Sequence, residues 1–184
     1  MPISSNLEHT RCLTCHRLAN TDRGVILIEF ALVLPVLLVI FIGLVEFSEA
    51  FTIARKLSTS ATTVSDLVSQ QPSVTSADLD DINLVANEIM RPYSSTPLSL
   101  VIVSVAADQD NATTVAWSYP SSAYAVGAAY ALPQAGLTEP NSSIIVVEAT
   151  YNFTPTVGHF LGSFPITQRA FFKPRFSANV AKAN

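Results

Sequence analysis

An apolar run near the N-terminus, VILIEFALVLPVLLVIFIGLV from Val25 to Val45, constrains this chain more than any other feature. Glu29 is the one charged residue in the run. A helix of about 20 apolar residues spans the ~30 Å hydrocarbon core of a bilayer. The run therefore predicts a single transmembrane helix over residues 25–45. Glu29 needs an explanation of its own, because a carboxylate in lipid is costly and is usually functional.

The charges on the two sides of this run differ in sign. Residues 1–24 carry three arginines against two acidic residues, whereas residues 46–184 carry seven Lys/Arg and eleven Asp/Glu. Basic flanks of a membrane helix are retained in the cytoplasm. We therefore expect a cytoplasmic leader over residues 1–24 and export of the C-terminal part. No basic stripe is present, so we expect no nucleic-acid partner.

Both cysteines of the chain, Cys12 and Cys15, lie in the leader. With His16 they form a C-x-x-C-H pattern, which is typical of haem attachment, and they could also contribute to a zinc site. We favour a plain unstructured leader, because haem is attached on the other side of the membrane and too few further ligands are present. We thus expect no cofactor and no metal, and an exported part that folds without disulfides.

The helical pattern continues beyond the run. Apolar residues recur at steps of three and four along one stripe: Phe47, Phe51, Ala54, Leu57, Ala61, Val64 and Val68. The charged residues of this stretch fall off that stripe: Glu46, Glu49, Arg55, Lys56 and Asp66. The pattern predicts that the helix extends to about Ser69 within residues 46–71, ends before Pro72, and supports the folded domain with this stripe.

A second, shorter helix is predicted between a cap at Thr75 or Ser76 and the Arg91-Pro92 dipeptide. Its apolar face would consist of Leu79, Ile82, Ala86 and Ile89. Three aspartates lie near its start: Asp78, Asp80 and Asp81. They complement the positive end of a helix; the alternative is a loose calcium site.

The remainder of the chain has the signature of β-structure. Runs rich in β-branched and aromatic residues, separated by turn residues, predict four antiparallel strands: Leu98–Ala106, Thr113–Tyr119, Ile144–Phe153 and Ile166–Lys173. A loop over Pro120–Ser143 separates the second from the third, and residues 177–184 are expected to be a frayed tail. The predicted fold is therefore α+β: a long N-terminal helix, transmembrane and then amphipathic, a second short helix and a small antiparallel sheet, the last two within a domain of residues 72–176.

The position of Glu29 matches a known type of signal. If the chain were cut after Gly24, Val25 would become the new N-terminus and Glu29 the fifth residue. A basic leader, a Gly, a Glu at that position and an uninterrupted apolar helix resemble the type IV prepilin signal. More narrowly, the stretch looks like the TadE-like family of the Tad (Flp) pilus system, on these residues: Gly24, Glu29, Phe30, Ala31, Leu32, Val33, Leu34, Pro35, Gly43, Glu46 and Phe47.

This resemblance implies a function and a set of partners. It implies a minor pseudopilin of the bacterial inner membrane with a periplasmic domain, cut between Gly24 and Val25 by a prepilin peptidase. Glu29 would pair with the N-terminal amine of a neighbouring subunit, and Phe30 and Pro35 would belong to the assembly surface. Other implied partners are Tad pilins and pseudopilins and, indirectly, inner-membrane platform proteins and an assembly ATPase; adhesion and biofilm formation would be downstream outcomes.

Three alternatives stay open. Ser48-Glu49-Ala50 could be a secretory cleavage site, which would release a periplasmic domain. The chain could also be a single-pass membrane-anchored adaptor that is never processed. An enzyme is the third, but beyond the apolar run the sequence has one histidine, His159, and no catalytic motif. We therefore expect no enzyme and no small-molecule substrate. For Pro35 we expect a lost hydrogen bond and a kink that helps the subunit move from bilayer to fibre.

Overall fold

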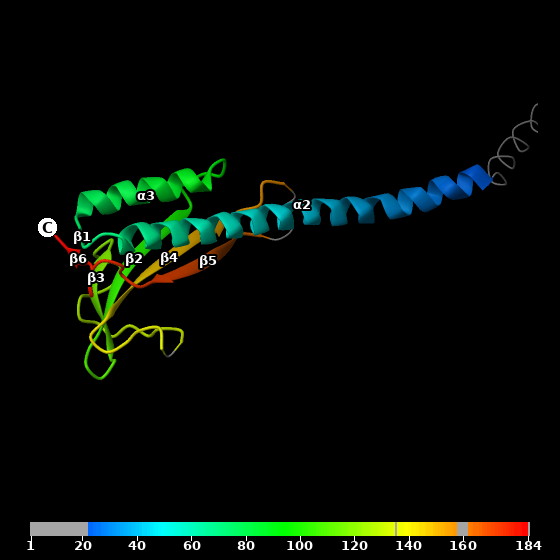
Figure 1. Ribbon diagram of the computed structural model, residues 1–184. Coiled ribbons are helices and arrows are strands. Elements are labelled where there is room, and N and C mark those ends of the chain that lie inside the picture. The colour runs from blue at the N-terminus through cyan, green and yellow to red at the C-terminus, as the bar shows by residue number, and fades with distance from the viewer. Residues whose placement is uncertain (1–21, 135, 158–161, 184) are drawn as a thin grey trace, which may run out of the picture. The chain divides into compact units, whose positions relative to one another are not determined.

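The computed structural model describes residues 22–134, 136–157 and 162–183. It divides into two compact units, Met1–Val45 and Glu46–Asn184, and each is described by itself. Figure 1 shows the elements, whose bounds are these: α2 Asp22–Ser69, β1 Ser73–Val74, α3 Ser76–Met90, β2 Leu98–Ala107, β3 Thr113–Tyr119, β4 Ser143–Phe153, β5 Phe164–Phe172 and β6 Ala181–Lys182.

The predicted α+β fold is confirmed. The long helix α2 ends at Ser69, as expected before Pro72. Helix α3 begins after Thr75, whose hydroxyl accepts a hydrogen bond from the backbone N–H of Asp78, while the Asp78 carboxylate accepts one from the backbone N–H of Thr75. This reciprocal capping box satisfies two otherwise unpaired donors. Each predicted strand is present, with bounds that differ by at most two residues.

The four long strands form one antiparallel sheet in the order β3-β2-β4-β5. Alternate side chains of each strand point to opposite faces, so the sheet has two cores. On one face, the part of α2 after Val45 and helix α3 pack on the sheet, as Figure 1 shows. Residues of this first core from β4 include Ile145, Val147 and Ala149, each with no exposed surface.

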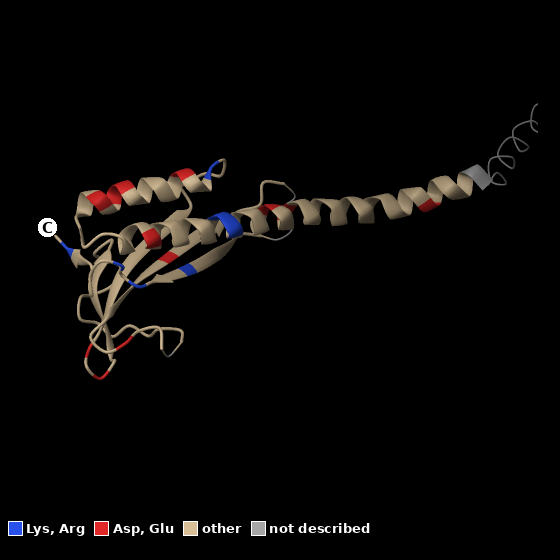
Figure 2. Ribbon diagram, viewed as in Figure 1, with Lys and Arg blue, Asp and Glu red and all other residues tan. Residues whose placement is uncertain are grey.

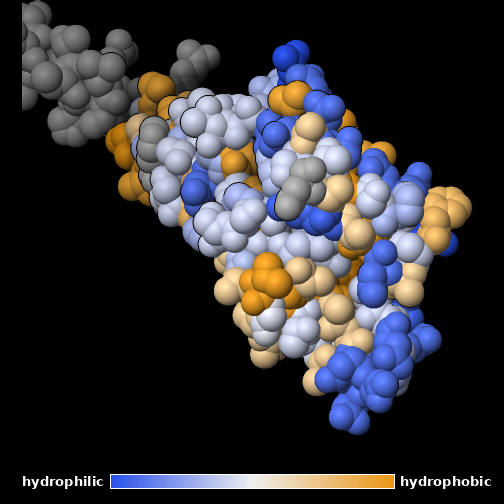
Figure 3. Space-filling model, turned by 90° about the vertical axis from the view of Figure 1, so that its left-hand side faces the viewer, coloured by the Kyte–Doolittle hydropathy of each residue, from blue (hydrophilic) through white to orange (hydrophobic). Residues whose placement is uncertain are grey.

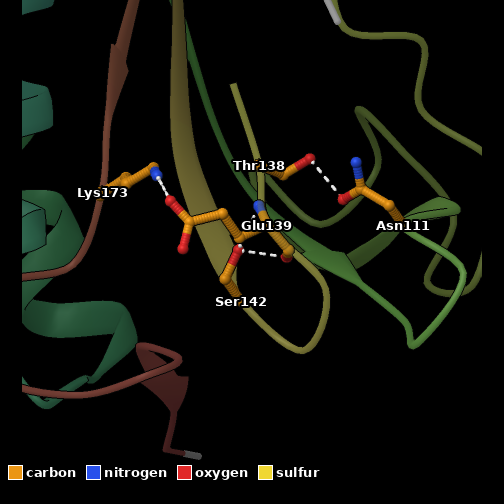
Figure 4. Close-up of polar contacts among 5 residues, drawn as sticks. All are labelled: Asn111, Thr138, Glu139, Ser142 and Lys173. Atoms are coloured by element: carbon orange, nitrogen blue, oxygen red, sulfur yellow. Dashed lines mark hydrogen bonds and ion pairs between the residues drawn. The ribbon is translucent and has the colours of Figure 1, made fainter. Parts of the chain in front are cut away.

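The opposite face of the sheet is covered by the long segment between β3 and β4. Val103, Val146 and Tyr130 are among the buried residues of this second core. Polar contacts fasten the end of the covering segment, as Figure 4 shows. Lys173 forms an ion pair with Glu139 at 2.9 Å, and the hydroxyl of Thr138 donates to the side-chain oxygen of Asn111 at 3.0 Å. The segment is thus an ordered layer of the fold.

The expectation of a frayed tail was wrong. Strand β6 pairs in parallel with β1, so the end of the chain closes a small second sheet. Val180 is 2% exposed, and its carbonyl accepts a hydrogen bond of 2.7 Å from the indole N–H of Trp117. The face of the molecule with β1, β6 and the start of α3 is a mosaic in which apolar residues form small separate patches (Figure 3).

Candidate functional site: the exposed apolar surface of α2

The first part of α2 presents its large apolar side chains outward. From Val25 to Val45, all of these side chains but that of Ile42 are exposed, by 38% at Leu34 to 74% at Leu32. The most apolar window of the helix has a mean hydropathy of 3.1 and no buried share. A soluble protein does not leave so long an apolar surface in water. The segment is compatible with a single-pass membrane anchor, by length and composition.

The predicted site residues all lie in this segment. Gly24, Val25, Glu29, Phe30 and Pro35 are part of α2. Val25 and Glu29 are four residues apart and therefore lie one above the other on the same side of the helix. Both are exposed, as is Phe30. Within the described residues, Glu29 makes no hydrogen bond or ion pair. Any partner for this carboxylate therefore comes from outside the described residues.

Pro35 lies inside the helix, and α2 continues as an α-helix through it. Proline has no N–H, so the carbonyl of Ala31, four residues earlier, lacks its usual donor. In lipid, such a carbonyl is satisfied by a neighbouring helix or by a local adjustment. Pro35 therefore leaves a second group, the carbonyl of Ala31 two residues beyond Glu29, that an external neighbour can satisfy.

The stripe predicted for the second part of α2 was correct from Leu57 onward and wrong at Phe47 and Phe51, while Ala54 is partly buried. Phe47 and Phe51 are 63% and 58% exposed, and the side chains that pack on the domain are instead those of Ala50 and Ile53. Glu46, predicted to fall off the stripe, is 1% exposed. Helix geometry explains this difference. Glu46 lies about three turns before Leu57 and therefore on nearly the same side of the helix, whereas Phe47 is rotated by about 80° from the direction of Leu57.

The aspartates at the start of α3 have partners within the protein. Asp78 belongs to the capping box, and its hydrogen bonds with the backbone and side chain of Thr75 lower the pKa of its carboxyl. Asp80 accepts a hydrogen bond from the Tyr119 hydroxyl. In the part of the chain that the structure describes, no group of three metal-ligating side chains forms a cluster. Cys12, Cys15, His16 and His159 lie outside the described residues.

One polar cluster was not predicted. The carboxylate of Glu148, on β4, accepts hydrogen bonds from the hydroxyls of Tyr124 at 3.0 Å and Tyr130 at 2.8 Å, and it pairs with Arg169 on β5 at 3.1 Å. Burial raises the pKa of both tyrosines, and their hydrogen bonds with Glu148 add to the effect. The cluster fastens the covering segment to the outer face of the sheet. Its residues are far apart in sequence, so no local pattern marks it.

Comparisons with known proteins agree with the resemblance of the first part of α2. Residues 24–64 match the model of a family described as TadE-like protein. No curated protein matches the chain, and no solved structure does. The matched segment contains the five predicted site residues and most of the buried face of α2. The TadE-like resemblance is thus confirmed for this segment, and it indicates a protein related to the Tad pilus.

Proposed function

We propose that this chain, whose residues 24–64 are TadE-like, is a minor pseudopilin that takes part in the assembly of a Tad/Flp-type pilus. In this proposal, prepilin peptidase cuts after Gly24. Before assembly, the subunit resides in the inner membrane with its C-terminal domain in the periplasm. Its work is assembly and not catalysis. Adhesion and biofilm formation follow from the assembled pilus.

The single observation that carries the proposal is Glu29 on an otherwise apolar, exposed helical surface inside the TadE-like segment. A carboxylate without a partner is costly in lipid. Cutting after Gly24 creates a charged amine at Val25, one turn from Glu29. Two opposite charges buried together cost far less than either alone. When subunits pack side by side, the amine of one can therefore neutralise Glu29 of the next and set the register between two apolar helices.

The partners follow from the same steps. Prepilin peptidase must reach the Gly24–Val25 bond on the cytoplasmic side, where the arginines of the leader favour retention of the N-terminus. Other Tad pilins and pseudopilins would meet the exposed surface of α2. Platform proteins of the inner membrane and an assembly ATPase would act on the subunit indirectly.

The structure bears on the secretory alternative. A cut after Ala50 would divide α2 and remove two buried residues from the folded unit, Glu46 at 1% and Ala50 at 8% exposed. Removing such packed residues costs stability. The boundary of the folded unit therefore supports a chain that keeps its apolar helix. The unprocessed adaptor keeps the helix as well, and only the state of the N-terminus separates it from the pseudopilin.

The experiment is to determine the intact mass and the N-terminal residue of the protein from its native host, with and without prepilin peptidase. The proposal expects a start at Val25 that disappears without the peptidase. A start at Phe51 would establish the secretory alternative. An uncut chain that keeps Cys12 and Cys15 in both strains would establish the adaptor.

A second measurement tests the role of Glu29. We expect Glu29→Gln to be cut and inserted normally but to reduce the number of pili, because the amine of Val25 loses its counter-charge. Asp110→Asn is the matched control, since Asp110 is an exposed carboxylate in the turn between β2 and β3. Normal piliation with Glu29→Gln would remove Glu29 from assembly.

A further inference from the structure

At the start of the unit Glu46–Asn184, the charged and aromatic residues of α2 are placed in reverse of a helix in water. Glu46 is 1% exposed and Glu49 is partly buried, whereas Phe47 and Phe51 are 63% and 58% exposed. The two exposed rings are stacked, with centroids 6.5 Å apart and planes at 16°. A helix on the surface of a soluble domain buries its apolar residues and exposes its charges. The reversed arrangement indicates surroundings other than water.

The exposed side of these turns offers few groups that need water. The hydroxyl of Thr52 donates to the carbonyl of Ser48 at 2.8 Å, so its proton has a partner within the helix. Beyond the apolar run, the first basic residues of α2 are Arg55 and Lys56, the blue band in Figure 2. No exposed charged residue therefore lies between Val45 and Arg55.

The connection between β4 and β5 adds two exposed apolar residues at the same end of the unit. The hydroxyl of Thr156 donates to the carboxylate of Glu49 at 3.0 Å, and Figure 1 shows this connection beside α2. Val157 follows Thr156 and is 51% exposed. Phe164, the first residue of β5, is 38% exposed, and its ring packs edge-on against Phe153 with centroids 5.4 Å apart. We name four exposed residues the junction patch: Phe47, Phe51, Val157 and Phe164.

Chain connectivity places this patch next to the apolar run. Phe47 and Phe51 lie roughly 3 and 9 Å beyond Val45 along the helix. These distances are upper limits at any angle between the run and the folded unit, because a bend cannot lengthen the chain. Side chains on a helix lean toward its N-terminus, which brings both rings closer to the run. Since the interfacial layer adds roughly 5–7 Å to each side of the hydrocarbon core, both rings can reach it.

We propose that the junction patch lies against lipid, at the surface of the membrane that holds the apolar run. The patch continues the exposed apolar surface of Leu44 and Val45 without a gap, which favours lipid over a separate protein partner. Phenylalanine suits the boundary between acyl chains and headgroups. Arg55 follows Phe51 by one turn, and its guanidinium makes no hydrogen bond or ion pair with a described residue. The folded unit then touches the bilayer at two places, the start of its helix and the β4–β5 connection.

Spin-label accessibility in the full-length protein tests this contact. Cys12→Ser and Cys15→Ser remove the native thiols, and a single cysteine is introduced and labelled with a nitroxide. The protein is placed in nanodiscs of phosphatidylcholine and phosphatidylglycerol, which leave both membrane faces open to solvent. Relaxation by oxygen, which concentrates in lipid, is compared with relaxation by a water-soluble nickel chelate. We expect the ratio of oxygen to nickel accessibility at Phe51→Cys and at Val157→Cys to exceed that of the controls at least threefold.

Two exposed positions outside the patch are the matched controls. Thr59→Cys lies on the same helix, about two turns beyond Phe51, and Val126→Cys replaces an apolar residue that is 74% exposed on the covering segment. Both labels should meet mainly the nickel chelate. High nickel accessibility at Phe51→Cys or at Val157→Cys would overturn the proposal and place that part of the patch in water. Low accessibility to both reagents would overturn it in favour of a protein partner or a second copy.

The inference rests on the proposed function only in assuming that the apolar run is anchored in a membrane. Leu44→Cys, at a position that is 61% exposed within the run, reports on that assumption in the same nanodiscs. Lipid at Leu44→Cys with water at Phe51→Cys would overturn the contact alone, whereas water at both would overturn the anchor as well. The cut after Gly24 does not enter this measurement, so the processing can fail while the contact stands.

Discussion

The two parts of α2 show how one helix can serve two surroundings. From Val25 to Val45, the large apolar residues other than Ile42 are exposed, and they lie on every side of the helix. From Glu46 to Ser69, apolar and small residues are buried on one side, and serines and threonines occupy much of the other. The first pattern is typical of a helix surrounded by lipid or by other helices, and the second of a helix on a domain surface. The change occurs without a break in the backbone, so side chains alone create it.

The largest effect is expected when one leucine in each part of α2 is replaced by alanine, and the two variants test directly whether the two surfaces differ. Leu57→Ala removes a side chain with no exposed surface from the core between α2 and the sheet. We expect a loss of about 2–5 kcal/mol in the free energy of unfolding, from lost burial and a cavity. Denaturant titration of the full chain in detergent, followed by the fluorescence of its single tryptophan, Trp117, measures this change.

Leu44→Ala is the matched control for that variant. Leu44 is 61% exposed on the first part of the helix. We expect it to change the unfolding of the C-terminal domain by less than about 0.5 kcal/mol, as is usual for an exposed position. Equal losses for the two leucines would contradict the division of α2 into two surfaces.

A second prediction extends the comparison to the residues that enclose the end of α2. Val180→Ala removes two buried carbons beside β6, and we expect a loss of about 2 kcal/mol in the free energy of unfolding. The emission of Trp117 should also shift, because its indole donates to the carbonyl of Val180. Phe176→Ala changes a larger side chain that is 74% exposed, and it should leave both quantities nearly unchanged. A larger effect of Phe176→Ala than of Val180→Ala would indicate that residues 177–184 form a frayed tail.

The smallest predicted effect concerns the hydrogen bond between Tyr119, on the edge strand β3, and Asp80, on α3. The hydrogen bond with Asp80, together with burial, raises the pKa of Tyr119 from 10.0 to about 12. A raised pKa means that the folded state favours the protonated phenol. This contribution to stability is therefore complete below pH 10 and is lost as the pH rises through about 12.

A titration of the tyrosine rings by nuclear magnetic resonance, with Tyr119 assigned from Tyr119→Phe, tests this prediction. Asp80→Asn should bring the pKa of Tyr119 back toward 10. Asp81→Asn removes the adjacent carboxylate, which has no described partner, and should not change that pKa. An unchanged pKa in Asp80→Asn would show that the hydrogen bond is not its cause.

Much of the fold could be predicted because its signals are local. Thr75 and Asp78 form a capping box within one turn, and Pro72 and Pro92 lie just beyond the helix ends. The strands have β-branched residues between turn residues, and their bounds needed little correction. The exposed surface of α2 and the position of Glu29 could also be predicted, since hydropathy and spacing are properties of consecutive residues.

The errors arose where the choice depended on distant partners. Phe47 and Phe51 were assigned to the buried stripe because they are large and apolar, yet the direction of that stripe is set by Leu57, Val64 and Val68. The face of α3 shows the same effect in milder form: Met90 is fully buried, whereas the predicted Ile89 is only partly so. The tail is polar and short, and its order depends on Trp117 and β1, which lie far away in the sequence.

The sequence by itself determined where this chain can meet a membrane, where its helices begin and end, and which carboxylate lies in the apolar run. These are consequences of composition and of spacing within one or two turns. Only the tertiary structure decided that Glu46 is buried and Phe47 exposed, and that Glu148 holds the covering segment. Each of these depends on which surfaces of the helices the sheet covers, and that is settled by packing between residues far apart in the chain.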